Sequence, residues 1–210
     1  MSDCNCFHWD NVPAVRLCEP HHKYHIGGKQ LASVSSVLRS TLPITPGYAA
    51  ASPDVVENAR LRGVSCDTLF SAYVNGTLDE IPQGTRLDVW DPLSKDGLLQ
   101  RLIPWWDRLG IRNAQAQVTL NDDEIAGTAD VVTPDCIFDL KTVHTLQPSY
   151  ELQLGGYLDL DAVNGDIKKA AIIHVTRRFH EPKLVWLDEH RCHADWFTVR
   201  EMWRLIRRMK

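Results

Sequence analysis

The stretch GTADVVTPDCIFDLKT, residues 127–142, reads as two strands joined by a tight turn. Its centre, TPDC at 133–136, suits a turn because proline presets the backbone at the second position and aspartate favours the third. This turn places Asp130 directly opposite Asp139, where Cβ atoms of an antiparallel pair lie roughly 4.5–5.5 Å apart. Lys141 is two residues beyond Asp139 and therefore points to the same face. The hairpin thus predicts two carboxylates and a lysine together on one side of a sheet.

Such a cluster favours a bound cation. Like charges placed directly opposite each other destabilise a sheet, and two carboxylates this close resist ionising together unless a cation neutralises them. Mg²⁺ takes oxygen ligands, usually one or two carboxylates plus waters and substrate phosphates. A lysine beside the metal can hold a nucleophilic water or a phosphate oxygen, which predicts metal-assisted hydrolysis of a phosphodiester. The alternative for this spacing alone is a solvated charged cluster on an exposed hairpin face.

Three pieces of sequence occur in the order and spacing of a known family. They are GTAD at 127–130, DLKT at 139–142 and QLGGY at 153–157. Together they resemble the core of the PD-(D/E)XK nucleases, in the branch of RecB-like and lambda-exonuclease-like enzymes. The resemblance extends more loosely from Lys23 to Arg178. It implies an α/β fold with a central mixed β-sheet flanked by helices, which is the restriction-endonuclease-like core.

The resemblance also implies roles for the hairpin residues. Asp130 and Asp139 would bind Mg²⁺ or Mn²⁺ together with the backbone carbonyl of Leu140. Lys141 would position and activate the attacking water.

The helix after the hairpin would border the active site. Gln153 and Tyr157 are four residues apart and share a helix face. The resemblance implies that Gln153 orients a water or phosphate and that Tyr157 contacts the DNA backbone. Tyr150 and Glu151, one turn earlier, are weaker candidates. Alone, this pattern would indicate only an amphipathic helix with one glutamine.

Two outer positions depart from the family pattern. The segment RGVSCD at 62–67 resembles an R-G-x-x-x-H element, and Asp67 stands where many relatives have a metal-binding histidine. Aspartate is still an oxygen ligand that suits a hard ion, so Asp67 is a candidate metal ligand. Gln117 stands where many relatives carry a glutamate, and a neutral amide cannot replace that charge. The prediction for Gln117 is a structural role.

Further partners are expected from the same resemblance. Arg62, Arg177 and Arg178 are candidate contacts to DNA phosphates, although each also reads as an ordinary surface residue. Ring-forming relatives make a homo-oligomer one expectation. The sequence has no G-x-x-x-x-G-K-[ST] motif, so any unwinding would come from a helicase partner, and a single-strand annealing protein is a second candidate partner.

Cysteines and histidines gather near the N-terminus. The residues are Cys4, Cys6, His8, Cys18, His21, His22 and His25. They could hold a structural zinc ion, but their spacing is not that of a standard zinc finger, and the histidines also fit a surface hairpin. Cys66, Cys136 and Cys192 are scattered, as expected of reduced thiols in a cytosolic protein.

Composition predicts one globular domain over 1–210, with an N-terminal hairpin region at 1–30 and a basic amphipathic helix at 191–210. Hydrophobic residues make up 44% and charged residues 24%, which is ordinary for a globular protein. No apolar run approaches the roughly 18 residues of a membrane helix, and the first residues lack a signal-peptide core. The expected compartment is the cytoplasm of a bacterium or a phage-infected cell, with no membrane partner. The net charge of −4 argues against non-specific DNA binding over the whole surface.

The last 16 residues, DWFTVREMWRLIRRMK, combine basic and apolar side chains at helical spacing. The basic residues are Arg200, Arg204, Arg207, Arg208 and Lys210, and the apolar ones are Phe197, Val199, Met202, Trp203, Leu205, Ile206 and Met209. One interpretation is a terminal helix with a buried apolar stripe and solvated arginines. The others are phosphate binding and a subunit contact.

The remaining pattern predicts alternating helices and strands. Helices are expected from Ser33 or Ser35 to before Pro43, and over 53–75, 94–109 and 148–163. Strands are expected within 12–26 and over 113–120, 124–132, 136–142, 170–176 and 184–187. In the second helix Val55, Val56, Ala59, Leu69, Phe70 and Tyr73 would form a buried stripe. Trp105 and Trp106 are expected in the core, with stacking on nucleic-acid bases as the alternative.

Together these features predict a Mg²⁺-dependent deoxyribonuclease, foremost an exonuclease of the phage recombination or repair type. Two alternatives remain open. One is a nuclease-fold protein that has lost catalysis and serves as a DNA-binding or assembly module. The other is an endonuclease of the same fold.

Overall fold

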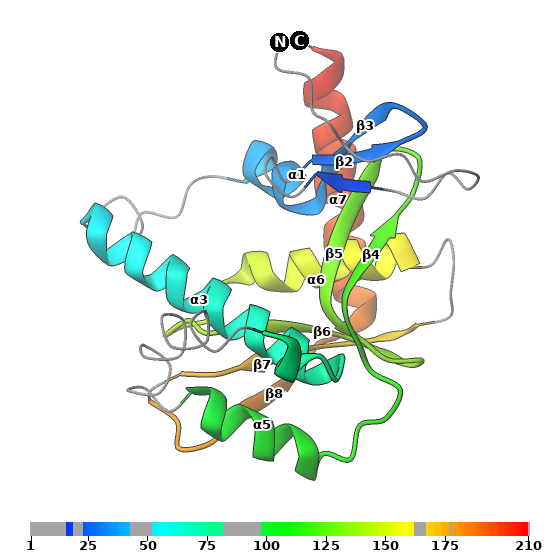
Figure 1. The fold of residues 1–210 in the computed structure, drawn as a ribbon. Coiled ribbons are helices and arrows are strands. Elements are labelled where there is room, and N and C mark those ends of the chain that lie inside the picture. The colour runs from blue at the N-terminus through cyan, green and yellow to red at the C-terminus, as the bar shows by residue number, and fades with distance from the viewer. Residues whose placement is uncertain are drawn as a thin grey trace.

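The computed structural model describes residues 16–18, 23–42, 52–81, 98–161, 167–176 and 178–209 (Figure 1). Its strands are β1 (Arg16–Cys18), β2 (Lys23–Ile26), β3 (Lys29–Ser33), β4 (Gln115–Asn121), β5 (Ile125–Val132), β6 (Cys136–Lys141), β7 (Lys169–His174) and β8 (Lys183–Trp186). Its helices are α1 (Val34–Thr41), α3 (Pro53–Val74), α5 (Leu98–Arg108), α6 (Pro148–Asp161) and α7 (Glu189–Arg208), with a short 3₁₀ turn, η2 (Leu78–Glu80).

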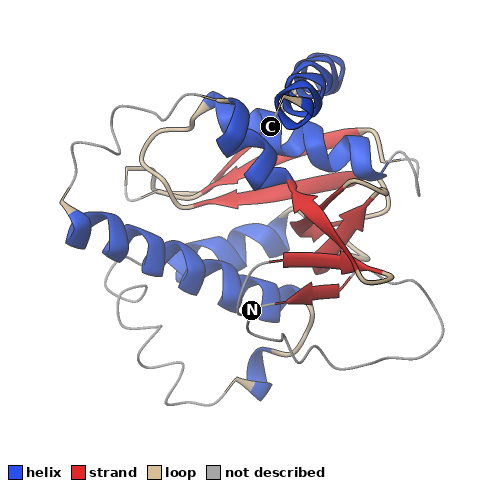
Figure 2. Ribbon diagram, turned by 90° about the horizontal axis from the view of Figure 1, so that it is seen from above, coloured by secondary structure: helices blue, strands red, loops and turns tan. Residues whose placement is uncertain are grey.

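The strands form one mixed sheet. The order is β1-β2-β3-β5-β6-β7-β8, and β4 pairs with β5 beside this path. The pairs β3–β5 and β6–β7 are parallel, whereas the other pairs are antiparallel. The sheet lies between helices, with α1, α6 and α7 contributing to one hydrophobic core and α3 and α5 to another (Figure 2). The structure is therefore α/β with a central mixed sheet flanked by helices, as the sequence predicts.

The β5–β6 hairpin has the predicted register. Val131 pairs with Phe138 and Val132 with Ile137, which places Asp130 opposite Asp139. Two hydrogen bonds between Thr133 and Cys136 close the turn. The backbone N–H of Thr133 donates to the carbonyl of Cys136 at 2.9 Å, and its hydroxyl accepts from the backbone N–H of Cys136 at 3.0 Å. The turn chemistry of TPDC thus fixes which residues of the two strands face each other.

Two adjacent glycines allow α6 to pack closely on its neighbours. A Cβ atom at Gly155 would lie 2.3 Å from the carbonyl oxygen of Cys192 on α7. A Cβ at Gly156 would lie 3.0 Å from Val34 on α1 and 3.2 Å from Trp196 on α7. No larger side chain fits there without moving α6 away from α1 and α7.

Helix boundaries follow from local chemistry. Ser33 caps α1, since its hydroxyl accepts from the Ser36 N–H at 3.0 Å, as predicted. Pro53 occupies the first turn of α3, where a missing N–H costs nothing. Gly110, with φ +64°, follows α5 in the left-handed conformation typical of a helix end.

The structure decides two expectations about burial, one for the tryptophan pair and one for α3. Trp105 and Trp106 lie in the core, so base stacking by this pair is excluded. The predicted stripe on α3 is wrong in its first half, because Val55 and Ala59 are exposed and burial begins at Cys66. The corrected core positions of α3 are Cys66, Leu69, Phe70 and Ser71.

The predicted apolar stripe of the last helix is also partly wrong. Only Val199 and Trp203 of that set are buried, and the stripe is completed by Cys192 and Trp196. Phe197, Met202, Leu205 and Met209 are exposed. Helical spacing alone does not distinguish these faces, because apolar side chains occur on both.

Within the described residues, no helix is long and apolar enough to cross a membrane. Cys66, Cys136 and Cys192 are buried free thiols, in keeping with the predicted reduced state.

Candidate active site

Asp139 and Lys141 form an ion pair at the end of β6. The Lys141 Nζ lies 2.6 Å from Asp139 Oδ2, and the Asp139 side chain is 0% exposed. Asp139 Oδ1 is buried and accepts no hydrogen bond from any described residue. A buried carboxylate oxygen without a donor is costly, so this oxygen has spare capacity to bind a cation.

Asp130 joins this pair from the adjacent strand. Register places it opposite Asp139, and its Oδ2 accepts a 2.6 Å hydrogen bond from the backbone N–H of Leu140. The two carboxylates and the lysine predicted from the sequence are therefore gathered as expected.

Burial raises the pKa of all three acids at the site. For Asp130 the pKa rises through burial, then through repulsion by Asp139 and Asp67. Burial also raises the pKa of Asp139, although Lys141 opposes this, and burial raises the pKa of Asp67 to about 6. Burial lowers the pKa of Lys141, but Asp139 and Asp130 outweigh it, so the lysine pKa lies above its usual value. Three acids share one lysine here.

This donor set suits a hard divalent ion. Nowhere in the described ranges do three Asp, Glu, His or Cys side chains approach closely enough to hold a metal ion by themselves. Mg²⁺ commonly binds through only one or two carboxylates and fills its other positions with waters and substrate phosphates. Asp130 and Asp139 fit that requirement. The third protein ligand predicted at Asp67 and the carbonyl of Leu140 remain predictions.

Asp67 reaches the site from α3 and is held by two neighbours. Gln117 on β4 donates through Nε2 to both carboxylate oxygens of Asp67, at 3.2 and 3.1 Å. The Ser71 hydroxyl, one helical turn along α3, lies 3.4 Å from Asp67 Oδ1 and 3.1 Å from Gln117 Nε2. Sequence reasoning missed Ser71, whose i,i+4 spacing from Asp67 was the available signal.

Tyr157 on α6 packs against the strand that carries Asp130. Its ring packs against Gly127, where a Cβ atom would lie 2.6 Å from Tyr157 Cε1, and its hydroxyl accepts from Gln153 Nε2 at 2.8 Å. Burial and the nearby Asp139 and Asp130 raise its pKa well above the usual value. Tyr157 is only 5% exposed, and the contact to the DNA backbone that the resemblance implies remains a prediction.

Two other tyrosines contribute to the surroundings. Tyr150, in the first turn of α6, has its ring centroid 4.9 Å from Lys141 Nζ, which is a cation–π distance. Tyr24 on β2 shares a 2.9 Å hydrogen bond with Thr128, two residues before Asp130 on β5. Glu151, by contrast, pairs with Arg191 on α7 at 2.5 Å and belongs to helix packing.

The structure describes only some of the residues predicted to contact DNA or zinc. Arg178 is exposed after β7, and Arg62 is half-buried on α3. Outside the described residues lie Arg177 and most of the N-terminal cluster, namely Cys4, Cys6, His8, His21 and His22, while of Cys18 only the backbone is described. The zinc site and the arginine contacts to DNA therefore remain predictions.

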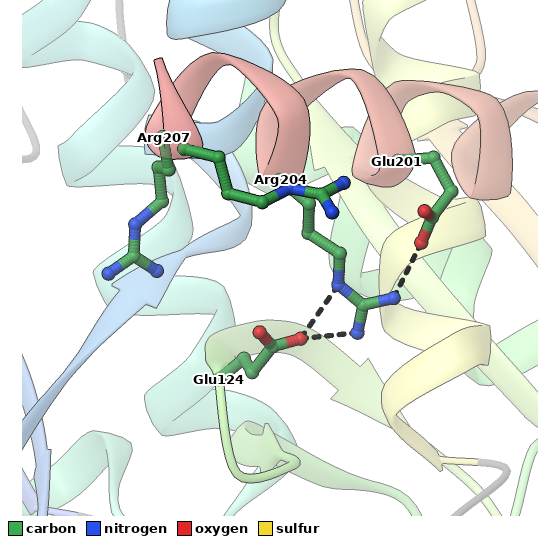
Figure 3. A pocket seen from close by; sticks show the side chains of 5 residues that line it. Glu124, Glu201, Arg204 and Arg207 are labelled. Carbon is green, nitrogen blue, oxygen red and sulfur yellow. Dashed lines mark hydrogen bonds and ion pairs between the residues drawn. The ribbon is translucent and has the colours of Figure 1, made fainter. Parts of the chain in front are cut away.

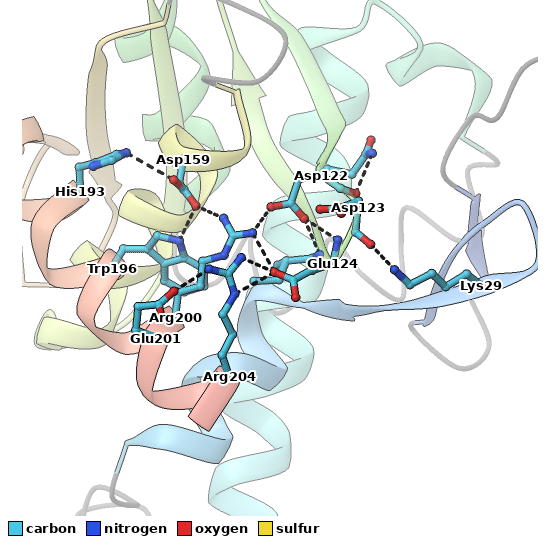
Figure 4. A network of polar contacts seen from close by, with 12 residues as sticks. Lys29, Asp122, Asp123, Glu124, Asp159, His193, Trp196, Arg200, Glu201 and Arg204 are labelled. Carbon is cyan, nitrogen blue, oxygen red and sulfur yellow. Dashed lines mark hydrogen bonds and ion pairs between the residues drawn. The ribbon is translucent and has the colours of Figure 1, made fainter. Parts of the chain in front are cut away.

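Two arginines of α7 are bound to acids instead of being solvated. Arg200 is 12% exposed and pairs with Asp159 at 2.6 Å, and it also pairs with Asp122 (Figure 4). Arg204 donates to Glu201 at 2.5 Å and through Nε to Glu124 at 2.9 Å. These ion pairs connect α7 to α6 and to the β4–β5 turn.

The end of α7 borders an open pocket of about 540 Å³. It is lined by Glu124, Glu201, Arg204, Arg207 and Arg208. Figure 3 shows Arg204 directed at the two carboxylates and Arg207 beside it. Arg204 is paired with acids, so among the described lining residues Arg207 and Arg208 would supply the positive charge for the predicted phosphate contact, which remains a prediction.

Comparison with known proteins gives structural matches only. No family model and no curated protein sequence matches the chain. One solved structure covers 83% of this chain and 78% of its own at 16% identity, but its TM-score of 0.36 is too low to establish a common fold. Another, described as a "putative exonuclease" from Eubacterium rectale, covers 84% of this chain and 80% of its own, with 14% identity and a TM-score of 0.54. The chain therefore shares its overall α/β fold with this protein.

Proposed function

We propose that this protein is a metal-dependent nuclease that hydrolyses phosphodiester bonds of DNA with Mg²⁺ or Mn²⁺. The observation that carries the proposal is the Asp139 carboxylate, which is fully buried, ion-paired to Lys141 and opposite Asp130, with one oxygen lacking any hydrogen-bond donor among the described residues. A nuclease-like fold with two carboxylates and a lysine at one strand end supports hydrolysis of a phosphodiester.

Each residue has a distinct part in the proposed reaction. Asp130 and Asp139 would hold the metal, which supplies Lewis-acid stabilisation of charge developing on the phosphate. Lys141 donates hydrogen bonds from Nζ, so it can hold the attacking water in line and stabilise negative charge next to the scissile phosphate. Gln153, which donates to the Tyr157 hydroxyl, would orient a water or a phosphate oxygen.

Within this class we favour a DNA exonuclease of the phage recombination or repair type. The support is the motif order of the chain together with its structural similarity to the E. rectale protein. Such an enzyme would act on linear DNA ends and would work with a single-strand annealing or helicase partner.

The decisive assay uses end-labelled linear, nicked and closed circular DNA, each with Mg²⁺, with Mn²⁺ and with a chelator. An exonuclease degrades the linear DNA only when metal is present and leaves closed circles intact. Metal-dependent cleavage of closed circles would show that the protein is an endonuclease and not an exonuclease. Cleavage that persists in the chelator would contradict the metal-dependent mechanism.

One observation favours a second candidate, a DNA-binding module without catalysis. The described residues contain no group of three side chains that could hold a metal, and Gln117 meets Asp67 with an amide that carries no charge. Calorimetric titration with Mn²⁺ separates the two functions. Mn²⁺ binding that is lost in Asp139→Asn supports the nuclease, whereas no Mn²⁺ binding together with intact DNA binding supports the module.

A further inference from the structure

Gln117 has an unusual backbone conformation in the middle of β4. Its φ is +58°, and β4 pairs regularly with β5 on both sides of it, through Ala116 with Val131 and Val118 with Ala129. This register places Gln117 opposite Asp130. A residue other than glycine rarely adopts positive φ, and within a strand the conformation is strained and redirects the side chain.

The redirected side chain reaches across to α3. Its Nε2 donates to both oxygens of Asp67 and lies 3.1 Å from the Ser71 hydroxyl. An amide donates to a carboxylate, whereas a glutamate at this position would repel it unless the two shared a proton or a metal. Gln117 in place of glutamate therefore suits Asp67 in place of histidine, because the amide donates to the carboxylate.

The other described non-glycine residue with positive φ offers a comparison. Asn113, with φ 55°, lies in the loop before β4, and asparagine tolerates this conformation better than most residues. Glutamine has no such preference. Strain that persists inside a strand next to a cluster of acids is typical of functional sites.

We infer that Gln117 is a positioning residue, which accepts a strained backbone in order to hold Asp67 beside Asp130 and Asp139. The inference rests on the proposed metal-dependent function. Gln117 links the strand opposite Asp130 to the helix that carries Asp67, so it fixes how far Asp67 lies from Asp130, one of the two acids that would hold the metal. Its own side chain supplies no charge and takes no part in bond breaking.

Two substitutions at position 117 distinguish the effect of the strained backbone from the effect of the amide side chain. Gln117→Gly removes the amide and relieves the positive φ, whereas Gln117→Ala removes the amide and keeps the strain. We expect Gln117→Gly to have the higher unfolding temperature, and both variants to need about tenfold more Mn²⁺ for half-maximal cleavage. Asn113→Gly, the matched control, should keep the wild-type Mn²⁺ requirement.

A second experiment tests whether Gln117 acts on the Mn²⁺ requirement through Asp67. In an Asp67→Ala background, Gln117→Gly should change the Mn²⁺ requirement no further. The inference is overturned if Gln117→Gly keeps the wild-type requirement, if the loss follows unfolding temperature across the variants, or if it adds in full to Asp67→Ala.

Calorimetric Mn²⁺ titration of the same variants keeps the inference separate from the proposed function. If the wild type binds Mn²⁺ without cleaving DNA, the nuclease fails and the Mn²⁺ affinities still decide the role of Gln117. If the wild type binds no Mn²⁺, both proposals fail.

Discussion

Tyr157 on α6 and Gly127 on β5 are in direct contact, so close that a Cβ atom at position 127 would lie 2.6 Å from the tyrosine ring. Gly127 begins the GTAD segment, three residues before Asp130. The packing of α6 therefore leaves no room for a side chain at this glycine, on the strand that also carries Asp130.

Gly127→Ala is expected to destabilise the protein by about 1–3 kcal/mol, because the added methyl group has no room beside the buried Tyr157 ring. Urea unfolding measures the loss. The control is Gly63→Ala on α3, where the new Cβ would lie 3.4 Å from Thr142, an ordinary contact. Since alanine is the better helix former, this control should be neutral or stabilising by up to about 1 kcal/mol. Equal effects of the two substitutions would contradict the packing argument.

Lys141→Ala and Asp139→Asn are each expected to reduce DNA cleavage by on the order of 10²–10³ or more, since under the proposed function one removes a donor at the scissile phosphate and the other a metal ligand. The measurement is the initial rate on linear DNA in Mn²⁺. Lys169→Ala and Asp123→Asn, both at exposed positions, are the matched controls and should retain activity. Near-normal rates in the two site variants, with unchanged circular dichroism, would refute the assignment.

Metal-free protein is expected to lose stability as pH rises from about 4 to above 6. The pKa of Asp67 is raised to about 6 in the folded state against 3.8 as an ordinary value, mainly by burial, so the folded state holds its proton more tightly than the unfolded chain does. Stability linked to this proton is present at low pH and disappears as pH rises through the folded pKa. Asp130 and Asp139, also with raised pKa values, act in the same direction.

Thermal unfolding in chelator across this pH range tests the idea. Asp67→Asn should flatten the profile between pH 4 and about 6, and saturating Mn²⁺ should raise the unfolding temperature most at pH 7. Glu124 contributes in the opposite direction. Burial raises its pKa, but the hydrogen bonds and charges of Arg204 and Arg200 together outweigh burial and lower the pKa, so the stability linked to Glu124 is lost only at more acidic pH. A flat wild-type profile between pH 4 and 6 would contradict the prediction.

Arg200→Ala is expected to cost about 3–5 kcal/mol, because it leaves the largely buried carboxylates of Asp122 and Asp159 without their cation. Urea unfolding measures this loss. Arg208→Ala, at an exposed position on the same helix, should change stability by less than about 0.5 kcal/mol. If both substitutions had the same small effect, the ion pairs of α7 would be incidental to the fold.

The hairpin could be predicted from the sequence because its decisive information is local. The turn residues at 133–136 fix the register, and the register fixes which carboxylates face each other. The caps at Ser33 and Gly110 are also local signals. For the same reason the amino-acid sequence alone was enough to predict that Asp130, Asp139 and Lys141 share one face.

Other features depend on contacts between distant segments. Helical spacing identifies an amphipathic helix but does not say how far a neighbour covers it, so the exposed start of α3 and the exposed side chains of α7 were predicted as buried. The strained backbone of Gln117 has no sequence signal of its own. It follows from the need of a β4 side chain to meet Asp67, which lies 50 residues earlier in the chain.

The boundary of burial along α3 places Asp67 at a transition in the helix. Residues 53–65 are exposed or half-buried, and full burial begins at Cys66, the residue before Asp67. At 1.5 Å per residue the first part is about 20 Å long. Asp67 is therefore carried by the first part of α3 that is packed on the core, and its position relative to Asp130 and Asp139 depends on that packing.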